Sequence, residues 1–570
     1  MKKWKIGIAA AVILILILCL VVMSADQYWW GDEVFSYFMA NSHDKAFVFS
    51  DGRVVSFFKD RIFGDSFSAT LKNFGAFILD LVKNFRNADY FTYPRPTETG
   101  WYTGADIANC FRVLPGQRFD YGTVYFHSMG DDANSFLFYS LLHTVGSLFP
   151  SLSDSPWAGY ILNLTALMFV LFLLTLICRR LGLDERETFL AILVYGISNA
   201  CLLQVTNIRP YMLATIFQLW LYYLHLHLFE SIEHGQDKRF SKTCLILFFV
   251  YVVGYISHYT TLAWAGFLGV NTVLLYWKKN RLQGKHYIRQ YILSGALAIM
   301  AGFVIDPVSI MGLALKFFGY HVTKPKSMFN ELYLALIKFI TIDRTGLILI
   351  GTFILFCLIL LMAQPEKSGA DKAVLLLGSI LLEEGLLLLA ATKMVYFTAL
   401  YPLIMLVLVH LASRALSLCC RRIPSGFLRA LIACCLIAAY GVCSLRSALD
   451  YKELEGREQK EVMAVLESHK TADLVYIRGK SDYYEFVPVL RNYENNLVLT
   501  PWKGDYHGLE NTEEYQSADE LAVVSTDKRS VDGEILKWMQ ENGFSTQKVL
   551  FDGEGYHVYY LAREAQGNAD

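Results

Sequence analysis

Long apolar runs are the strongest constraint that this sequence places on its fold. A helix that crosses a bilayer needs about 20 mostly apolar residues. Eleven candidate runs cover residues 6–25, 156–178, 188–206, 211–230, 243–257, 260–277, 290–311, 346–363, 373–391, 397–413 and 429–448. The chain is 54% hydrophobic, whereas soluble domains are about 45–50% apolar even with glycine counted. We therefore predict an α-helical polytopic membrane protein with about eleven transmembrane helices.

The loops between these runs predict the orientation in the membrane. Basic pairs occur on the side of Lys2, at Arg179-Arg180, Lys238-Arg239, Lys278-Lys279 and Arg421-Arg422. The opposite loops hold few basic residues besides Arg209 and Lys393. Because cytoplasmic loops carry the excess of Lys and Arg, the N-terminus is predicted to be cytoplasmic. The first run is longer than a signal-peptide core of about 7–15 residues, so it is predicted to stay as a transmembrane helix.

Two domains are predicted. Residues 1–450 form the transmembrane domain, with a long first extracytoplasmic loop at 26–155 that contains amphipathic helices near 71–83 and 135–149. Residues 451–570 hold 13 Lys and Arg against 23 Asp and Glu, and predict a small extracytoplasmic α/β domain. Helices are expected at 458–469 and 533–543, and strands at 472–478, 520–526, 548–551 and 557–562. No glycine-rich phosphate loop occurs in this domain.

Two adjacent carboxylates, Asp32 and Glu33, follow the first apolar run among Trp29, Trp30 and Phe35. A carboxylate that is partly desolvated beside aromatic rings is a competent general base. The alternative is a pair that is simply solvated at the membrane surface. Ionisable groups at the ends of spans commonly face a cavity, which favours the first interpretation.

Two further outward-facing features have the chemistry of a site. Asp131 and Asp132 precede the helix predicted at 135–149 and could bind an acceptor or a cation. Arg209 stands almost alone among basic residues on the outer side, with Pro210 at the start of the next helix. A guanidinium at a helix N-terminus suits a phosphate, although span-end arginines also reach to lipid headgroups.

Four short motifs resemble those of the GT-C membrane glycosyltransferases, in particular the bacterial dolichyl-phosphate-mannose-protein mannosyltransferase-like (glycosyltransferase family 39-like) proteins. The matching stretches are WGDEVFS (30–36), DANSFLFYSLLH (132–143), RPY (209–211) and HY (258–259). The second stretch keeps the family's Asp, Leu, second Tyr and His but has Asn134-Ser135-Phe136 in place of His-Pro-Pro. An Arg-Tyr pair that the family places near its later spans is replaced here by Lys393 and Tyr396.

This resemblance implies a GT-C fold and a sugar transfer from a polyprenyl-phosphate donor at the outer face of a bacterial cell membrane. It implies an inverting displacement with Asp32 and Glu33 as catalytic residues and Asp131 and Asp132 as a second acidic motif. The donor phosphate would be bound by Arg209, Tyr211, Lys393 and Tyr396, in a cavity lined by His143, His258 and Tyr259. The acceptor (protein, lipid or envelope glycan) and the sugar stay open. The resemblance implies no definite cofactor, and whether a divalent cation takes part also stays open.

Two other classes of function agree with parts of the sequence. A lipid or glycan transporter or flippase would explain the many spans and the acidic pair Glu383-Glu384 within an apolar run. Transporters often show sequence repeats and sites at the membrane midplane, and neither is visible here. A non-catalytic scaffold is the third reading. The cysteines show no metal-type spacing, and nothing in the sequence indicates binding to nucleic acid.

Overall fold

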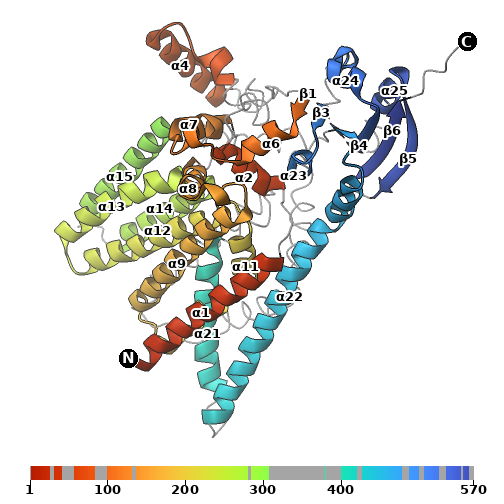
Figure 1. The fold of residues 1–570 in the computed structure, drawn as a ribbon. Coiled ribbons are helices and arrows are strands. Elements are labelled where there is room, and N and C mark those ends of the chain that lie inside the picture. Colours follow the sequence, from red (N-terminus) through yellow and green to blue (C-terminus); the bar gives the residue numbers. More distant parts are fainter. Residues whose placement is uncertain are drawn as a thin grey trace, which may run out of the picture.

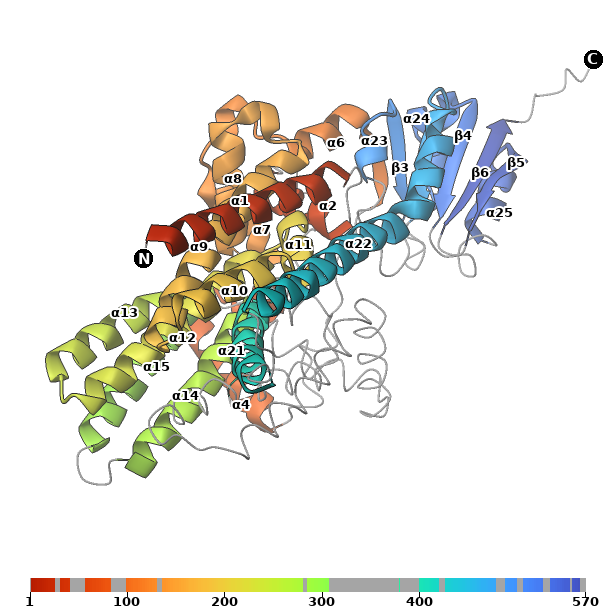
Figure 2. The same ribbon diagram turned by 90° about the horizontal axis from the view of Figure 1, so that it is seen from below.

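The computed structural model describes residues 2–25, 31–41, 57–83, 99–130, 136–279, 284–306, 379, 399–419, 426–477, 487–499, 506–525, 534–553 and 556–563. Within these ranges the chain forms a bundle of long helices and a separate β-sheet (Figure 1). The long helix α22 (Gly426–Glu467) runs from the bundle to the sheet. It packs along two bundle helices, α1 (Lys2–Ala25) and α11 (Asn199–Thr206) (Figure 2).

Among the described residues, four helices are long and apolar enough to cross a membrane: Ile6–Ala25, Pro156–Arg180, Tyr211–Ile232 and Tyr287–Ile305. A fifth span is possible if α10 (Glu185–Gly196) and α11, which meet at 54°, form one broken span. The other long helices are α13 (Asp237–Tyr255), α14 (Tyr259–Lys279) and α21 (Tyr401–Cys419). The expected spans 346–363 and 373–391 lie outside the described residues except for Ser379. The total of eleven therefore stays a prediction.

The first loop folds into short helices at the end of the bundle that is nearer the sheet (Figure 1). They are α2 (Gly31–Asn41), α4 (Phe67–Lys83), α6 (Gly104–Phe111), α7 (Tyr121–Gly130) and α8 (Phe136–Leu148). Three single turns accompany them at Phe58–Ile62, Pro115–Gln117 and Pro150–Leu152. The helices expected at 71–83 and 135–149 are confirmed as α4 and α8. That α4 lies on a membrane surface stays a prediction.

In the part of the chain that the structure describes, the sheet has six strands in the order β1-β3-β2-β4-β6-β5. Five come from the C-terminal region: β2 (Asp473–Ile477), β3 (Asn495–Leu499), β4 (Glu520–Ser525), β5 (Phe544–Asp552) and β6 (His557–Arg563). The strand β2 is parallel to β3 and β4, and the other pairs are antiparallel. The sixth strand, β1 (Gly100–Thr103), belongs to the first loop. The sequence predicted β2, β4, β6 and part of β5 but neither β1 nor β3.

The two faces of this sheet pack against different partners because side chains alternate along a strand. Leu474, Tyr476 and Val498 belong to the large core that continues into the helical bundle. Val475, Ile477 and Leu497 belong to a second core under α24 (Glu513–Ser517) and α25 (Glu534–Glu541). The helix α25 ends just before Gly543, whose φ of +95° favours glycine. The region thus has three layers, while α22 passes without a break through the predicted domain boundary at residue 450.

Candidate active site

The acidic pair of the first loop opens α2. Asp32 and Glu33 occupy its first turn, where the helix dipole favours negative charge. Their surroundings differ: Asp32 is partly exposed and Glu33 is buried. The Glu33 Oε1 atom accepts a hydrogen bond from the Ile208 backbone N–H at 3.2 Å. Glu33 therefore ties α2 to the segment before α12 (Tyr211–Glu233), and Asp32 is the carboxylate of the pair that is partly exposed.

The segment 207–210 connects α11 to α12 (Tyr211–Glu233) and carries Arg209. It is held from α9 (Pro156–Arg180) as well as from α2. The buried Asn163 Nδ2 group donates to the backbone oxygens at the end of α11, including that of Asn207 at 2.8 Å. Gly159 allows α9 to come close, because a Cβ atom added there would lie 2.3 Å from Ile208 Cγ2. The placement of Arg209 is therefore fixed by several independent contacts.

Arg209 and α2 meet directly. Its Nη1 atom donates to the Asp32 backbone oxygen at 3.2 Å and lies 3.3 Å from Ser36 Oγ. The guanidinium carbon lies 5.4 Å from the centre of the Phe35 ring, within the range of a cation–π contact. These contacts hold the guanidinium against the first two turns of α2, at the backbone of the residue whose carboxylate is partly exposed. The N-terminus of α12 adds its own positive potential at the same place.

A buried tyrosine secures the other side of α2. The Tyr37 hydroxyl donates to the Ser155 backbone oxygen at 2.6 Å and accepts from the Gly159 N–H at 3.0 Å. The phenol thus completes the first turn of α9. Burial raises the pKa of Tyr37 well above its usual value, so the hydroxyl stays protonated and able to donate.

An aromatic group contains Tyr211, two residues after Arg209 in the chain, together with His258 and Tyr259. The Tyr211 and His258 rings pack edge to face with centres 5.6 Å apart, and His258 stacks on Tyr259 at 4.4 Å. His258 Nδ1 lies 2.8 Å from Thr260 Oγ1. The turn between α13 and α14 therefore lies against the first residue of α12.

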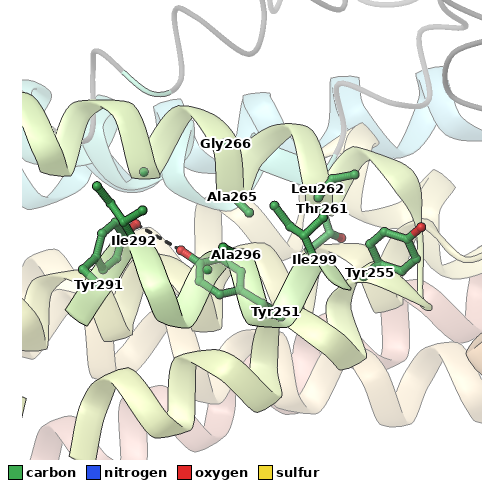
Figure 3. Close-up of a pocket in the computed structure, with 13 residues that line it drawn as sticks. Tyr251, Tyr255, Thr261, Leu262, Ala265, Gly266, Tyr291, Ile292, Ala296 and Ile299 are labelled. Atoms are coloured by element: carbon green, nitrogen blue, oxygen red, sulfur yellow. Dashed lines mark hydrogen bonds between the residues drawn. The ribbon is translucent and has the colours of Figure 1, made fainter. Parts of the chain in front are cut away.

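A largely apolar pocket of about 310 Å³ begins at this turn and lies among α13, α14 and α15 (Gly284–Ile305). Figure 3 shows Tyr255 and Thr261 at one end, and Tyr291 and Ile292 at the other. Its walls are otherwise mostly small: Ala265, Gly266, Gly269, Gly295, Ala296 and Ala298. The pocket has room for an apolar chain, since ligand pockets begin at about 300 Å³. Thr261 links it to the site, because its N–H donates to the His258 oxygen at 3.0 Å.

His143, the third residue predicted to line the cavity, has a packing role within the first loop. It is 1% exposed, and its Nδ1 lies 3.3 Å from Asn41 Oδ1 while its Nε2 lies 3.1 Å from the Gln117 oxygen. His143 therefore joins α8 to the end of α2.

The structure thus brings together Asp32, Glu33, Arg209, Tyr211, His258 and Tyr259. The remaining predicted residues, Asp131, Asp132, Lys393 and Tyr396, lie outside the described residues, as do Glu383 and Glu384. Among the residues that are described, no group of three or more His, Cys, Asp or Glu is arranged to hold a metal ion.

Three polar residues of this site were not predicted: Ser36, Tyr37 and Asn163. Each sits among apolar neighbours in the sequence, and a polar side chain within a predicted span is the signal that could have singled out Asn163.

Neither a protein-family model nor a curated protein sequence matches the chain. Among solved structures, the chain is similar to the crystal structure of ArnT from Cupriavidus metallidurans bound to undecaprenyl phosphate. The identity is 10%, the TM-score is 0.43, and the match covers 75% of this chain and 88% of that chain. This likeness assigns no function, which has to come from the residues of the site.

Proposed function

We propose that this protein is a membrane glycosyltransferase that moves a sugar from a polyprenyl-phosphate-linked donor to an acceptor hydroxyl. The observation that carries the proposal is the contact between Arg209 and the first turn of α2, in which the guanidinium binds the backbone oxygen of Asp32, a residue whose side chain is partly exposed. The acidic and basic groups of this site are what a displacement at a sugar phosphate requires: a base for the nucleophile and a positive charge for the leaving group.

The proposed reaction is one inverting displacement. The Asp32 carboxylate takes the proton of the acceptor hydroxyl while the hydroxyl oxygen attacks the anomeric carbon. The bond from that carbon to the phosphate oxygen breaks, and its electron pair leaves with the polyprenyl phosphate. The Arg209 guanidinium stabilises the negative charge that develops on the phosphate.

Glu33 acts in this proposal as a positioning residue. Its buried carboxylate holds the Ile208 N–H and so fixes the distance between α2 and Arg209. Lys393 and Tyr396 are proposed as further phosphate ligands, and Asp131 and Asp132 as acceptor or cation ligands, on the motif resemblance alone.

A lipid-linked donor agrees with the pocket beside the site. The helix α15 forms one wall of the pocket and is apolar enough to span a membrane. Only 17% of its most apolar 18-residue stretch is buried inside the protein. An isoprenoid chain could therefore enter from the bilayer and leave its phosphate at Arg209. A nucleotide sugar has no long apolar chain that would fill such a pocket.

The test is turnover by the full chain in liposomes with a panel of polyprenyl-phosphate sugars, measured as release of polyprenyl phosphate. Asp32→Asn should lower turnover by about 10²-fold or more, the usual contribution of a general base. Asp65→Asn removes an exposed carboxylate of the same loop and should keep full turnover. Turnover by Asp32→Asn equal to that of the unmodified chain would exclude Asp32 as the base. Movement of intact donor across the bilayer with no phosphate release would favour a flippase.

A further inference from the structure

The first loop and the C-terminal region share one continuous sheet. Gly100–Thr103 pairs antiparallel with Asn495–Val498, so the first loop supplies the strand that covers the edge of β3. In Figure 1 the orange strand β1 lies beside the blue strand β3. An uncovered sheet edge is an open template for pairing, and here it is filled by a segment almost 400 residues earlier in the chain.

The junction between β1 and α6 is too tight for any side chain at Gly104. A Cβ atom there would lie 2.2 Å from the Tyr493 backbone oxygen and 2.8 Å from the Arg491 backbone oxygen. The Gly104 N–H itself donates to the Glu494 oxygen at 3.2 Å. A capping box at Thr103 and Asp106 then starts α6 directly at this point. The start of α6 is therefore fixed to the C-terminal region by close contacts with backbone atoms, which cannot rotate away as a side chain could.

The other end of α6 packs on α2. The Phe111 and Phe38 rings have their centres 4.9 Å apart. The buried Asn41 Nδ2 group donates to the Phe111 backbone oxygen at 2.9 Å. The Arg491 guanidinium carbon lies 5.9 Å from the centre of the same Phe111 ring. Phe111 thus stands between a residue of the C-terminal region and the helix that carries Asp32.

We infer that the β1–α6 segment (Gly100–Phe111) is a positioning element through which the C-terminal region holds α2, and with it Asp32, against Arg209. Gly104 and Phe111 are its positioning residues, and neither touches the reacting atoms. This inference rests on the proposed function, because it assigns the C-terminal region a part in the same site.

A matched pair of substitutions tests the inference in the full chain. Gly104→Ala puts a Cβ atom against the Tyr493 and Arg491 backbone oxygens just before β3, whereas Gly75→Ala adds the same atom in the same loop with nothing within 4 Å. The first readout is hydrogen–deuterium exchange of the amides in 31–41. The second is equilibrium binding of a polyprenyl phosphate without sugar. Gly104→Ala should speed exchange in 31–41 and weaken phosphate binding, each by about tenfold, and lower kcat by about 10–100-fold, as expected for a site displaced by about 1 Å.

Arg491→Ala is the second variant. It removes the side chain whose guanidinium lies on Phe111, leaves the β1–β3 backbone ladder intact, and should change both readouts in the same direction to a smaller extent. If Gly104→Ala does not fold, the same two readouts measured on Arg491→Ala test the inference. Exchange in 31–41 and phosphate affinity within about twofold of Gly75→Ala would overturn the inference. Both readouts are independent of turnover, so they separate this failure from a failure of the proposed reaction.

Discussion

Gly159→Ala should disrupt the site from within the bundle. Gly159 is the point where α9 approaches the segment that carries Arg209. An added Cβ would lie 2.3 Å from Ile208 Cγ2, 2.7 Å from Cγ1 and 2.8 Å from Cδ1. Ile208 is β-branched and stiff at χ1 and is fully buried, so rotation of its side chain gives no relief. The backbone of Ile208 must therefore move away from α9.

The size of the effect follows from the cost of overpacking, the energy of the hydrogen bond that opposes the shift, and the rate loss that a misplaced reacting group causes. Reaching ordinary contact requires a shift of about 1 Å, and overpacking of a core costs about 1–3 kcal/mol. The hydrogen bond from Ile208 to the Glu33 carboxylate, at 3.2 Å, contributes about 1.5–3 kcal/mol. Because the cost of overpacking and the energy of this hydrogen bond are comparable, the bond alone does not hold the segment in place against the clash. A reacting group misplaced by about 1 Å costs about 10²-fold in rate.

We therefore expect Gly159→Ala to lower kcat for polyprenyl-phosphate release by about 10²-fold, with folding intact by size-exclusion chromatography. Ile208→Ala removes the three atoms that the new Cβ would meet, so the double variant should be as active as Ile208→Ala alone. Full activity of Gly159→Ala, or a double variant no better than Gly159→Ala, would refute this account of the segment.

Three further outcomes are expected. Arg209→Lys should keep a charge but lose the second guanidinium nitrogen, and should bind polyprenyl phosphate more weakly than the unmodified chain and more tightly than Arg209→Ala, as isothermal calorimetry can show. Gly295→Leu should fill the pocket and weaken binding of long-chain polyprenyl phosphates by about tenfold, the equivalent of about two buried methylenes; an equal loss for short chains would argue against the pocket as the chain site. Tyr37→Phe should lower stability by about 1 kcal/mol, because the Ser155 oxygen and the Gly159 N–H lose their shared partner; an unchanged unfolding temperature would assign the phenol no stabilising role.

The sequence predicted that Asp32 and Arg209 lie close together, because each is predicted to lie at the extracytoplasmic end of an apolar run. Two runs that cross the same membrane bring their outer ends to one level, so loop position alone limits where these groups can be. The different burial of Asp32 and Glu33 could not be predicted. It depends on which carboxylate the Ile208 N–H reaches, and that is a property of the packing between α2, α9 and segment 207–210.

The sheet shows the same limit. The apolar alternation in β2, β4 and β6 is local and was sufficient to predict them. Gly100–Thr103 was missed because its partner β3 is far away in the chain, and four residues carry no periodicity of their own. The continuous helix α22 was divided at residue 450 because the composition changes there from apolar to charged. A helix persists through such a change when no proline or cap residue ends it.

The central claim is that Arg209 recognises a lipid phosphate beside α2. Its most direct test compares the binding of a polyprenyl phosphate with that of the matching polyprenyl alcohol, in the unmodified chain and in Arg209→Ala. We predict a preference for the phosphate of at least about tenfold in the unmodified chain, the gain expected from a charge-assisted hydrogen bond, and its loss in Arg209→Ala. An equal preference for the phosphate in both proteins would contradict the claim.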